Sequence, residues 1–143
     1  MLSLMIEILS GVALAIVAIP LWKSCGRYEK HIIAVSLIIA GLLYPLLGLF
    51  NSVPLEALKY EFLGLLGTIF FGVLGIKYSF WFLALGWFLH GPWDFLVPTL
   101  EDVSHMPSWY AGLCLGFDVV AGSYLAYRAY NLSSQLPQST QQV

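Results

Sequence analysis

Charged residues are scarce in this chain. Asp, Glu, Lys and Arg make up only 10% of its 143 residues, whereas an ordinary soluble domain has about 25%. Hydrophobic residues account for 59%, and the mean hydropathy is +0.83. This composition excludes an ordinary soluble protein and predicts an integral membrane protein. At this length the chain has room for four or five spans of about 20 apolar residues each, and for no separate soluble domain.

Other features that the chain lacks exclude further classes. The net charge of -2 provides no basic surface for nucleic acid. The two cysteines, Cys25 and Cys114, lie at different expected depths and form no disulfide framework. Without an internal repeat, an inverted-repeat transporter is not supported. There is also no phosphate-binding loop that ends in Gly-Lys-Ser/Thr and no Gly-x-Ser-x-Gly elbow.

Five apolar segments are long enough to cross a bilayer. No Lys or Arg precedes the first of them, and basic residues follow it from Lys23 onward, so we expect a retained helix rather than a cleaved signal peptide. The sequence thus predicts an all-α polytopic transmembrane helix bundle within residues 1–130. Residues 131–143 are rich in Gln and Ser and are expected to form a disordered cytoplasmic tail. The expected spans are residues 2–22, 32–50, 55–76, 80–97 and 108–127.

The basic residues predict the orientation of the bundle. With five spans, five of the six basic residues fall on one side of the membrane and only Lys59 lies near the other. The positive-inside rule then places the N-terminus outside and the C-terminus in the cytoplasm. We therefore expect a multi-pass protein of the cell membrane, and glycine-lined helix faces that favour pairing with further copies of the chain.

Ionisable residues recur within the apolar segments. Counted along ideal helices, five of them lie about 5 to 15 Å below the outer surface. His90 and Asp94 are four residues apart and share a helix face, as do Cys114 and Asp118. Because charges in a bilayer are costly, such residues usually face a protein interior or a wet cavity. The five are Glu7, Glu61, His90, Asp94 and Asp118.

The order of these features resembles an uncharacterised family of small bacterial integral membrane proteins, a domain of unknown function. The most distinctive part is Gly-Trp-x-x-His-x-x-Trp-Asp at residues 86–94. In that family a pair of histidines commonly follows the aspartate, whereas Phe95-Leu96-Val97 stands here. The resemblance implies a membrane protein with a set of marked residues and supplies no activity. It rests on Tyr44, Gly48, Glu61, residues 75–79 (Gly-Ile-Lys-Tyr-Ser), residues 86–94, residues 112–114 (Gly-Leu-Cys) and Asp118.

Three classes of function fit these residues. The first binds or chemically processes a lipid-soluble small molecule by acid–base chemistry of His90, Asp94, Glu61 and Asp118; a His-x-x-x-acid pair beside another helix's carboxylate is loosely similar to the sites of membrane sterol isomerases. The second is a site for a cation or divalent transition metal, with His90, Asp94, Asp118 and His105 as ligands. The third is a structural or accessory membrane protein whose polar layer holds its helices together. Supporting roles are expected for Glu7, Trp87, Trp93 and Cys114.

Overall fold

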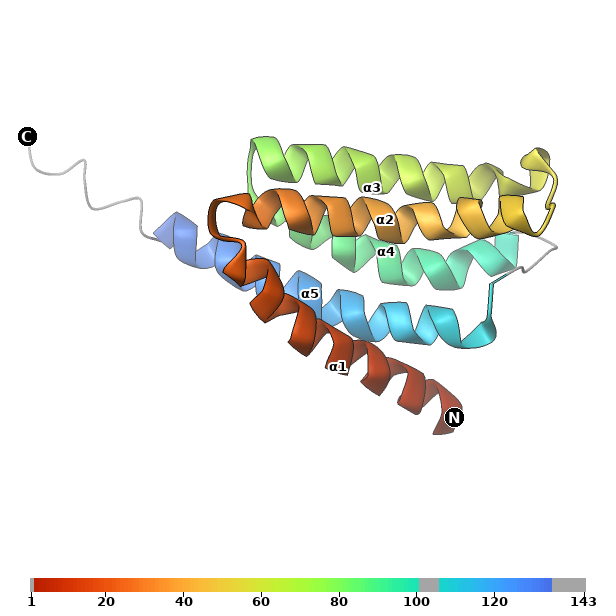
Figure 1. Ribbon diagram of the computed structural model, residues 1–143, viewed down its shortest axis with the longest axis horizontal. Helices are drawn as coiled ribbons and strands as arrows, with labels where there is room; N and C mark the ends of the chain where they lie inside the picture. Colours follow the sequence, from red (N-terminus) through yellow and green to blue (C-terminus); the bar gives the residue numbers. More distant parts are fainter. Residues whose placement is uncertain (1, 101–105, 135–143) are drawn as a thin grey trace, which may run out of the picture.

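The computed structural model describes residues 2–100 and 106–134 and is entirely helical in these ranges, without a strand (Figure 1). This confirms the predicted all-α class. Three helices are long and apolar enough to cross a membrane, at residues 2–24, 26–50 and 55–77. The elements are α1 (Leu2–Ser24), the 3-10 helix η1 (Gly26–Tyr28), α2 (Glu29–Phe50), the 3-10 helix η2 (Leu55–Leu58), α3 (Lys59–Lys77), α4 (Phe80–Leu100) and α5 (Ser108–Ser134).

Several helix boundaries differ from the expected spans, since α1 ends at Ser24, α2 begins at Glu29 and α4 ends at Leu100. The third span opens with η2, because the tight turn after α2, with Ser52 at a φ of 59°, leads through Pro54 into a 3-10 segment. The fifth helix continues to Ser134, so residues 131–134 of the expected tail are helical. No proline lies between Ser108 and Pro137, and the helix has no local reason to stop at residue 127. Residues 135–143 lie outside the described ranges.

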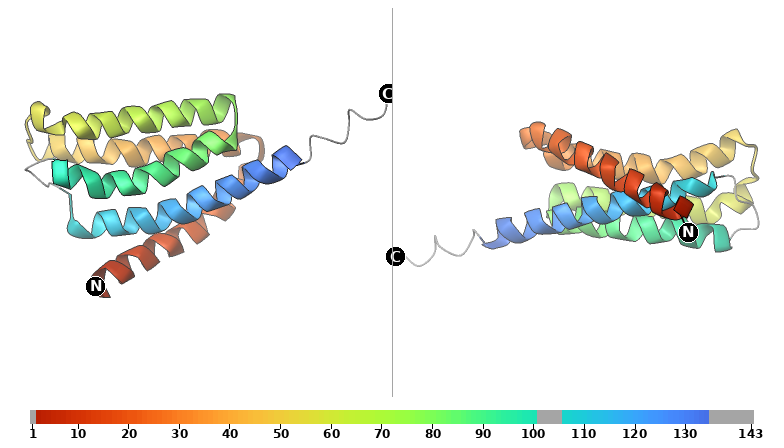
Figure 2. Two further views of the ribbon diagram at one scale, coloured as in Figure 1. Left: turned by 180° about the vertical axis from the view of Figure 1, so that it is seen from behind. Right: turned by 90° about the horizontal axis from the view of Figure 1, so that it is seen from below.

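The helices pack side by side in a fixed order. Helix α3 contacts α2 and α4, α5 packs against α4, and α1 packs mainly against α5, while its Trp22 reaches Trp87 of α4. Figures 1 and 2 show α1 leaning away from the other helices toward its N-terminus. Two glycines of α5 allow α1 to pack closely against it, because a Cβ at Gly116 would collide with the carbonyl of Ile8 and one at Gly112 with the side chain of Glu7. Small residues that let two helices approach closely are a common packing device in lipid.

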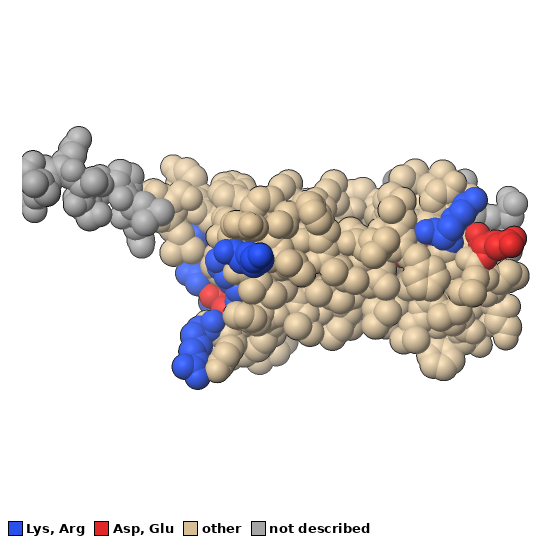
Figure 3. Space-filling model, turned by 90° about the horizontal axis from the view of Figure 1, so that it is seen from above, with Lys and Arg blue, Asp and Glu red and all other residues tan. Residues whose placement is uncertain are grey.

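The charged side chains gather at the two ends of the bundle. On the face that Figure 3 shows, mainly basic side chains with acidic atoms among them lie at one end, basic and acidic side chains lie at the other, and the surface between them is almost free of charge. Many apolar side chains on this surface are exposed, among them Leu9, Phe70 and Leu85. An apolar belt between two polar ends is the surface that a lipid bilayer covers.

A buried carboxylate ties α2 to α5 at the more basic end. Glu29 is 6% exposed and accepts hydrogen bonds from the Tyr124 hydroxyl at 2.7 Å and from Arg128 Nη2 at 2.6 Å. The hydrogen bond to Glu29 raises the pKa of the Arg128 guanidinium further above its usual range. This interhelical contact joins residues 99 positions apart. The sequence assigned no role to Glu29.

Candidate functional site

Helix α4 carries a buried stripe that faces its helical neighbours. Gly86, His90, Asp94 and Val97 are all buried, at spacings of three or four residues that keep them on one face. His90 is 5% exposed and Asp94 1% exposed. The predicted sharing of one face by these two side chains is confirmed, since His90 Nδ1 lies 3.8 Å from Asp94 Oδ2.

The nearest partner of His90 comes from α5. His90 Nδ1 lies 3.0 Å from Asp118 Oδ2, and Asp118 is 2% exposed. His90 also hydrogen-bonds to the backbone of Ala40 on α2. An imidazole can donate at both nitrogens only when it is protonated, and the two carboxylates beside it favour that form. The imidazole thus connects three helices through polar contacts.

A second line of polar groups runs along α5 to Asp94. The Cys114 thiol hydrogen-bonds to Asp94 and to Tyr110, which lies one helical turn before it. The Tyr110 ring packs edge-on against Tyr44 of α2, with 5.4 Å between ring centroids. Cys114 is therefore a hydrogen-bonding member of the site. Tyr110 was not predicted from the sequence, although its i, i+4 spacing from Cys114 places both on one face.

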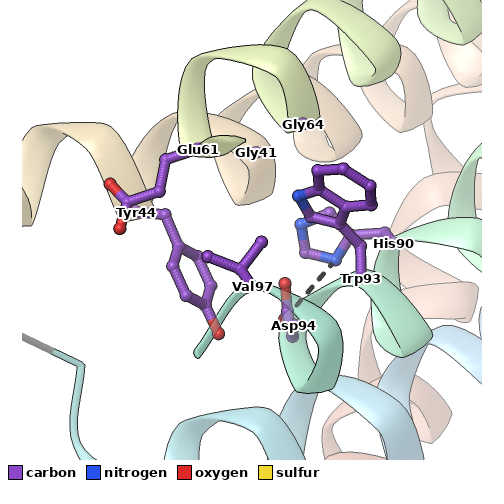
Figure 4. Close-up of a pocket in the computed structure, with 8 residues that line it drawn as sticks. All are labelled: Gly41, Tyr44, Glu61, Gly64, His90, Trp93, Asp94 and Val97. Atoms are coloured by element: carbon purple, nitrogen blue, oxygen red, sulfur yellow. Dashed lines mark ion pairs between the residues drawn. The ribbon is translucent and has the colours of Figure 1, made fainter. Parts of the chain in front are cut away.

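A small cavity adjoins these groups, and Figure 4 shows its lining from α2, α3 and α4. Its volume is about 10 Å³, close to the least space that one water needs. Glu61, which is 2% exposed, and Tyr44 stand on one side of it, and His90 and Asp94 on the other (Figure 4). The complete lining is Gly41, Tyr44, Glu61, Gly64, His90, Trp93, Asp94 and Val97.

Two larger cavities approach the site from different directions. One of about 380 Å³ lies between α3 and α4, shares Gly64, His90 and Trp93 with the small cavity, and is otherwise mostly apolar. Its volume falls in the range of small-molecule sites, about 300 to 1,000 Å³. Another of about 300 Å³ lies where α4 ends and α5 begins, and reaches Tyr44 and Asp94. The polar groups thus lie between an apolar cavity and a cavity at one end of the bundle.

The structure brings together most of the predicted site residues. His90, Asp94, Asp118, Cys114, Glu61 and Trp93 meet around the small cavity or its walls. The Trp87 ring lies 6.3 Å from that of His90 but also packs on Trp22 and Phe117 in the apolar core.

One predicted contributor, Glu7, is not part of this group. Glu7 of α1 packs against Gly112, and Gly112 lies on the face of α5 roughly opposite Cys114 and Asp118. It is therefore separated from the site by α5. His105 lies outside the described residues.

The predicted metal site receives no support from the described part of the chain. No group of three or more His, Cys, Asp or Glu among these residues is arranged to hold a metal ion. The closest approach in the candidate set is the 3.0 Å contact between His90 Nδ1 and Asp118 Oδ2, a hydrogen-bond distance. The metal interpretation stays a prediction.

The chain has no match among models of known protein families, curated proteins or solved structures. The resemblance to a family of small membrane proteins therefore stays a prediction, and the argument for function depends on the site alone.

Proposed function

We propose that this chain is a five-span protein of the cell membrane, with its N-terminus outside and its C-terminus in the cytoplasm. Helices α4 and α5 have 21 and 27 residues, which at about 1.5 Å per residue is enough to cross a hydrocarbon core of about 30 Å. They lie beside the three more apolar helices and carry the polar residues of the site, which lower their hydropathy. The basic end of the bundle (Figure 3) faces the cytoplasm by the positive-inside rule.

Within this bundle we propose a site in the outer half that binds or chemically processes a lipid-soluble small molecule by acid–base chemistry of His90 and its carboxylates. The observation that carries the proposal is the cavity of about 380 Å³ between α3 and α4, which is lined by apolar and small residues and reaches His90. An apolar pocket with a few convergent polar groups is the usual form of a small-molecule site.

Charge balance gives the site its acid–base character. An imidazolium at His90 neutralises one carboxylate, and the second acid is then most stable in its neutral, protonated form, because an unpaired buried charge is costly. Asp118 is the closer of the two to His90, at 3.0 Å against 3.8 Å for Asp94. We therefore assign the ionised role to Asp118 and the protonated role to Asp94. Asp94 also lines the cavity at the end of α4, through which a proton can exchange with the outer face.

The proposal can be tested by filling the cavity without touching its polar groups. Gly67 lines the cavity, and a Cβ added there meets nothing within 4 Å, so a side chain can start there without a clash and Gly67→Trp is the cavity-filling variant. Leu66 is 62% exposed and does not line it, so Leu66→Trp is the matched control. The wild type and both variants are extracted from native membranes, and lipid-soluble molecules that co-purify are quantified by mass spectrometry.

We expect one molecule to co-purify with the wild type and the Leu66 variant at close to one per chain, and to fall at least tenfold in the Gly67 variant. The same set of bound molecules in all three proteins would reject the cavity as a binding site. A folded Gly67 variant, verified by its helical circular dichroism and its thermal transition, is required for the comparison.

A further inference from the structure

Two buried polar atoms at the junction of the cavities lack hydrogen bonds among the described residues. They are the indole nitrogen Nε1 of Trp93 and the carboxylate oxygen Oδ2 of Asp94. The nearest cation to Asp94 Oδ2 is His90 Nδ1, at 3.8 Å, which is too long for a hydrogen bond. Buried polar atoms are nearly always hydrogen-bonded in folded proteins. Two such atoms without hydrogen bonds beside one small cavity indicate that a ligand group supplies their hydrogen-bond partner.

The two residues adjoin the same space. Trp93 and Asp94 both line the small cavity (Figure 4). Trp93 Nε1 lies against the backbone of Gly64, where an added Cβ would be only 2.5 Å from it. Gly64 and Trp93 also line the larger cavity between α3 and α4. A group in the small cavity can therefore belong to a molecule whose apolar part lies in the larger one.

The chemistry of the two atoms narrows the class of ligand. The indole N–H can only donate, and we place the proton of the neutral Asp94 on Oδ1, so that Oδ2 accepts. A hydroxyl group accepts from the first and donates to the second. A carbonyl group satisfies only the indole, and a carboxylate would add negative charge beside Asp94 and Asp118.

We propose that the ligand of this site is a lipid-soluble alcohol, whose hydroxyl group lies between Trp93 Nε1 and Asp94 Oδ2 and whose apolar part occupies the cavity between α3 and α4. This assignment rests on the proposed function, since it names the class of molecule that the same cavity binds. The hydroxyl is held by one hydrogen bond from the indole N–H and one to the carboxyl group. His90, at the wall shared by both cavities, lies beside it.

The test compares three probes of one length, 1-decanol, 2-decanone and decane. Binding is measured by the shift of the thermal unfolding transition with probe concentration, in a detergent without hydroxyl groups. Trp93→Phe removes the donor and keeps an aromatic ring. Trp87→Phe is the matched control, because Trp87 Nε1 is also buried without a hydrogen bond but lines neither cavity. Gly67→Trp reports whether a probe binds in the cavity at all.

We expect decanol to bind the wild type about tenfold more tightly than decanone or decane. Trp93→Phe should remove this preference and Trp87→Phe should retain it. If decanone or decane binds as tightly as decanol and Gly67→Trp abolishes that binding, the hydroxyl assignment is overturned while the cavity site stands. If no probe binds, or if Gly67→Trp leaves all binding unchanged, both the assignment and the proposed binding cavity are rejected.

Discussion

Replacement of His90 by leucine leaves two buried carboxyl groups without a cation. Asp94 and Asp118 are 1% and 2% exposed, and the imidazole nitrogen of His90 lies within 3.8 Å and 3.0 Å of their oxygens. In the proposed charge state of the native site, an imidazolium offsets one negative charge. In the variant both acids must bind a proton, because a buried, unpaired carboxylate is unstable.

The free-energy cost of His90→Leu depends on which group binds the proton that His90 holds in the native site. A free aspartate titrates near pH 3.9 and a free histidine near pH 6.5. Moving one proton from histidine to aspartate therefore costs about 2.6 units at about 1.36 kcal/mol each, or about 3.5 kcal/mol. Between about pH 4 and pH 6.5, folding of the variant takes up one proton more than folding of the native protein does.

This difference in bound protons determines the sign of the pH dependence. The destabilisation by His90→Leu should be near zero at about pH 4 and grow by about 1.4 kcal/mol per pH unit. Above about pH 6.5 it should level off near 3.5 kcal/mol, because the unfolded native chain has then lost its histidine proton as well.

The measurement is the free energy of unfolding in mixed micelles titrated with sodium dodecyl sulfate, at several pH values from 4.5 to 7.5. Thr68→Val is the control, because Thr68 is 5% exposed and polar but does not ionise, so its cost should be independent of pH. A cost for His90→Leu that is equally flat would refute the charge assignment. It would mean that the two acids are solvated and stay ionised when His90 is removed.

Three further predictions concern the topology and the packing. A membrane-impermeant maleimide applied to intact cells should label Ser52→Cys and leave Cys25 unlabelled, and the opposite result would reverse the proposed orientation. Gly116→Leu should lower stability by about 1–3 kcal/mol because its side chain meets the α1 backbone, whereas Gly67→Ala should change it little; equal effects would contradict the close contact of α1 with α5. Arg128→Gln should cost about 1–3 kcal/mol, since it leaves the buried Glu29 with the Tyr124 hydroxyl as its remaining donor, while the 35% exposure of the Arg128 side chain limits the loss; no measurable loss would contradict a role of this ion pair in holding α2 to α5.

The helical class and the main pairings of site residues follow from local patterns. Apolar runs, prolines and helix periodicity predict five helices, and the four-residue spacing predicts that His90 and Asp94 share a face. The same periodicity places Gly112 and Gly116 opposite Cys114 and Asp118, and the structure has the α1 contact on that glycine face.

The depth of a residue along its helix can also be counted from the sequence. The neighbouring helix that its side chain faces cannot. Glu7 was expected in the polar layer because its depth matched that of Glu61. The structure places it against Gly112, because this part of α1 packs on the face of α5 opposite Cys114 and Asp118. A count of residues along the chain contains no information about which neighbour a helix face meets.

The sequence by itself determined that this chain is helical, apolar and rich in ionisable groups at one level of the bundle, since these properties depend on composition and on spacing within single helices. Only the tertiary structure decided that Asp118 is the nearest partner of His90, that Tyr110 and Cys114 lead to Asp94, and that a cavity opens between α3 and α4. Each of these depends on how helices are rotated and packed against one another. That arrangement is determined by the sum of many interhelical contacts and cannot be derived from any one segment.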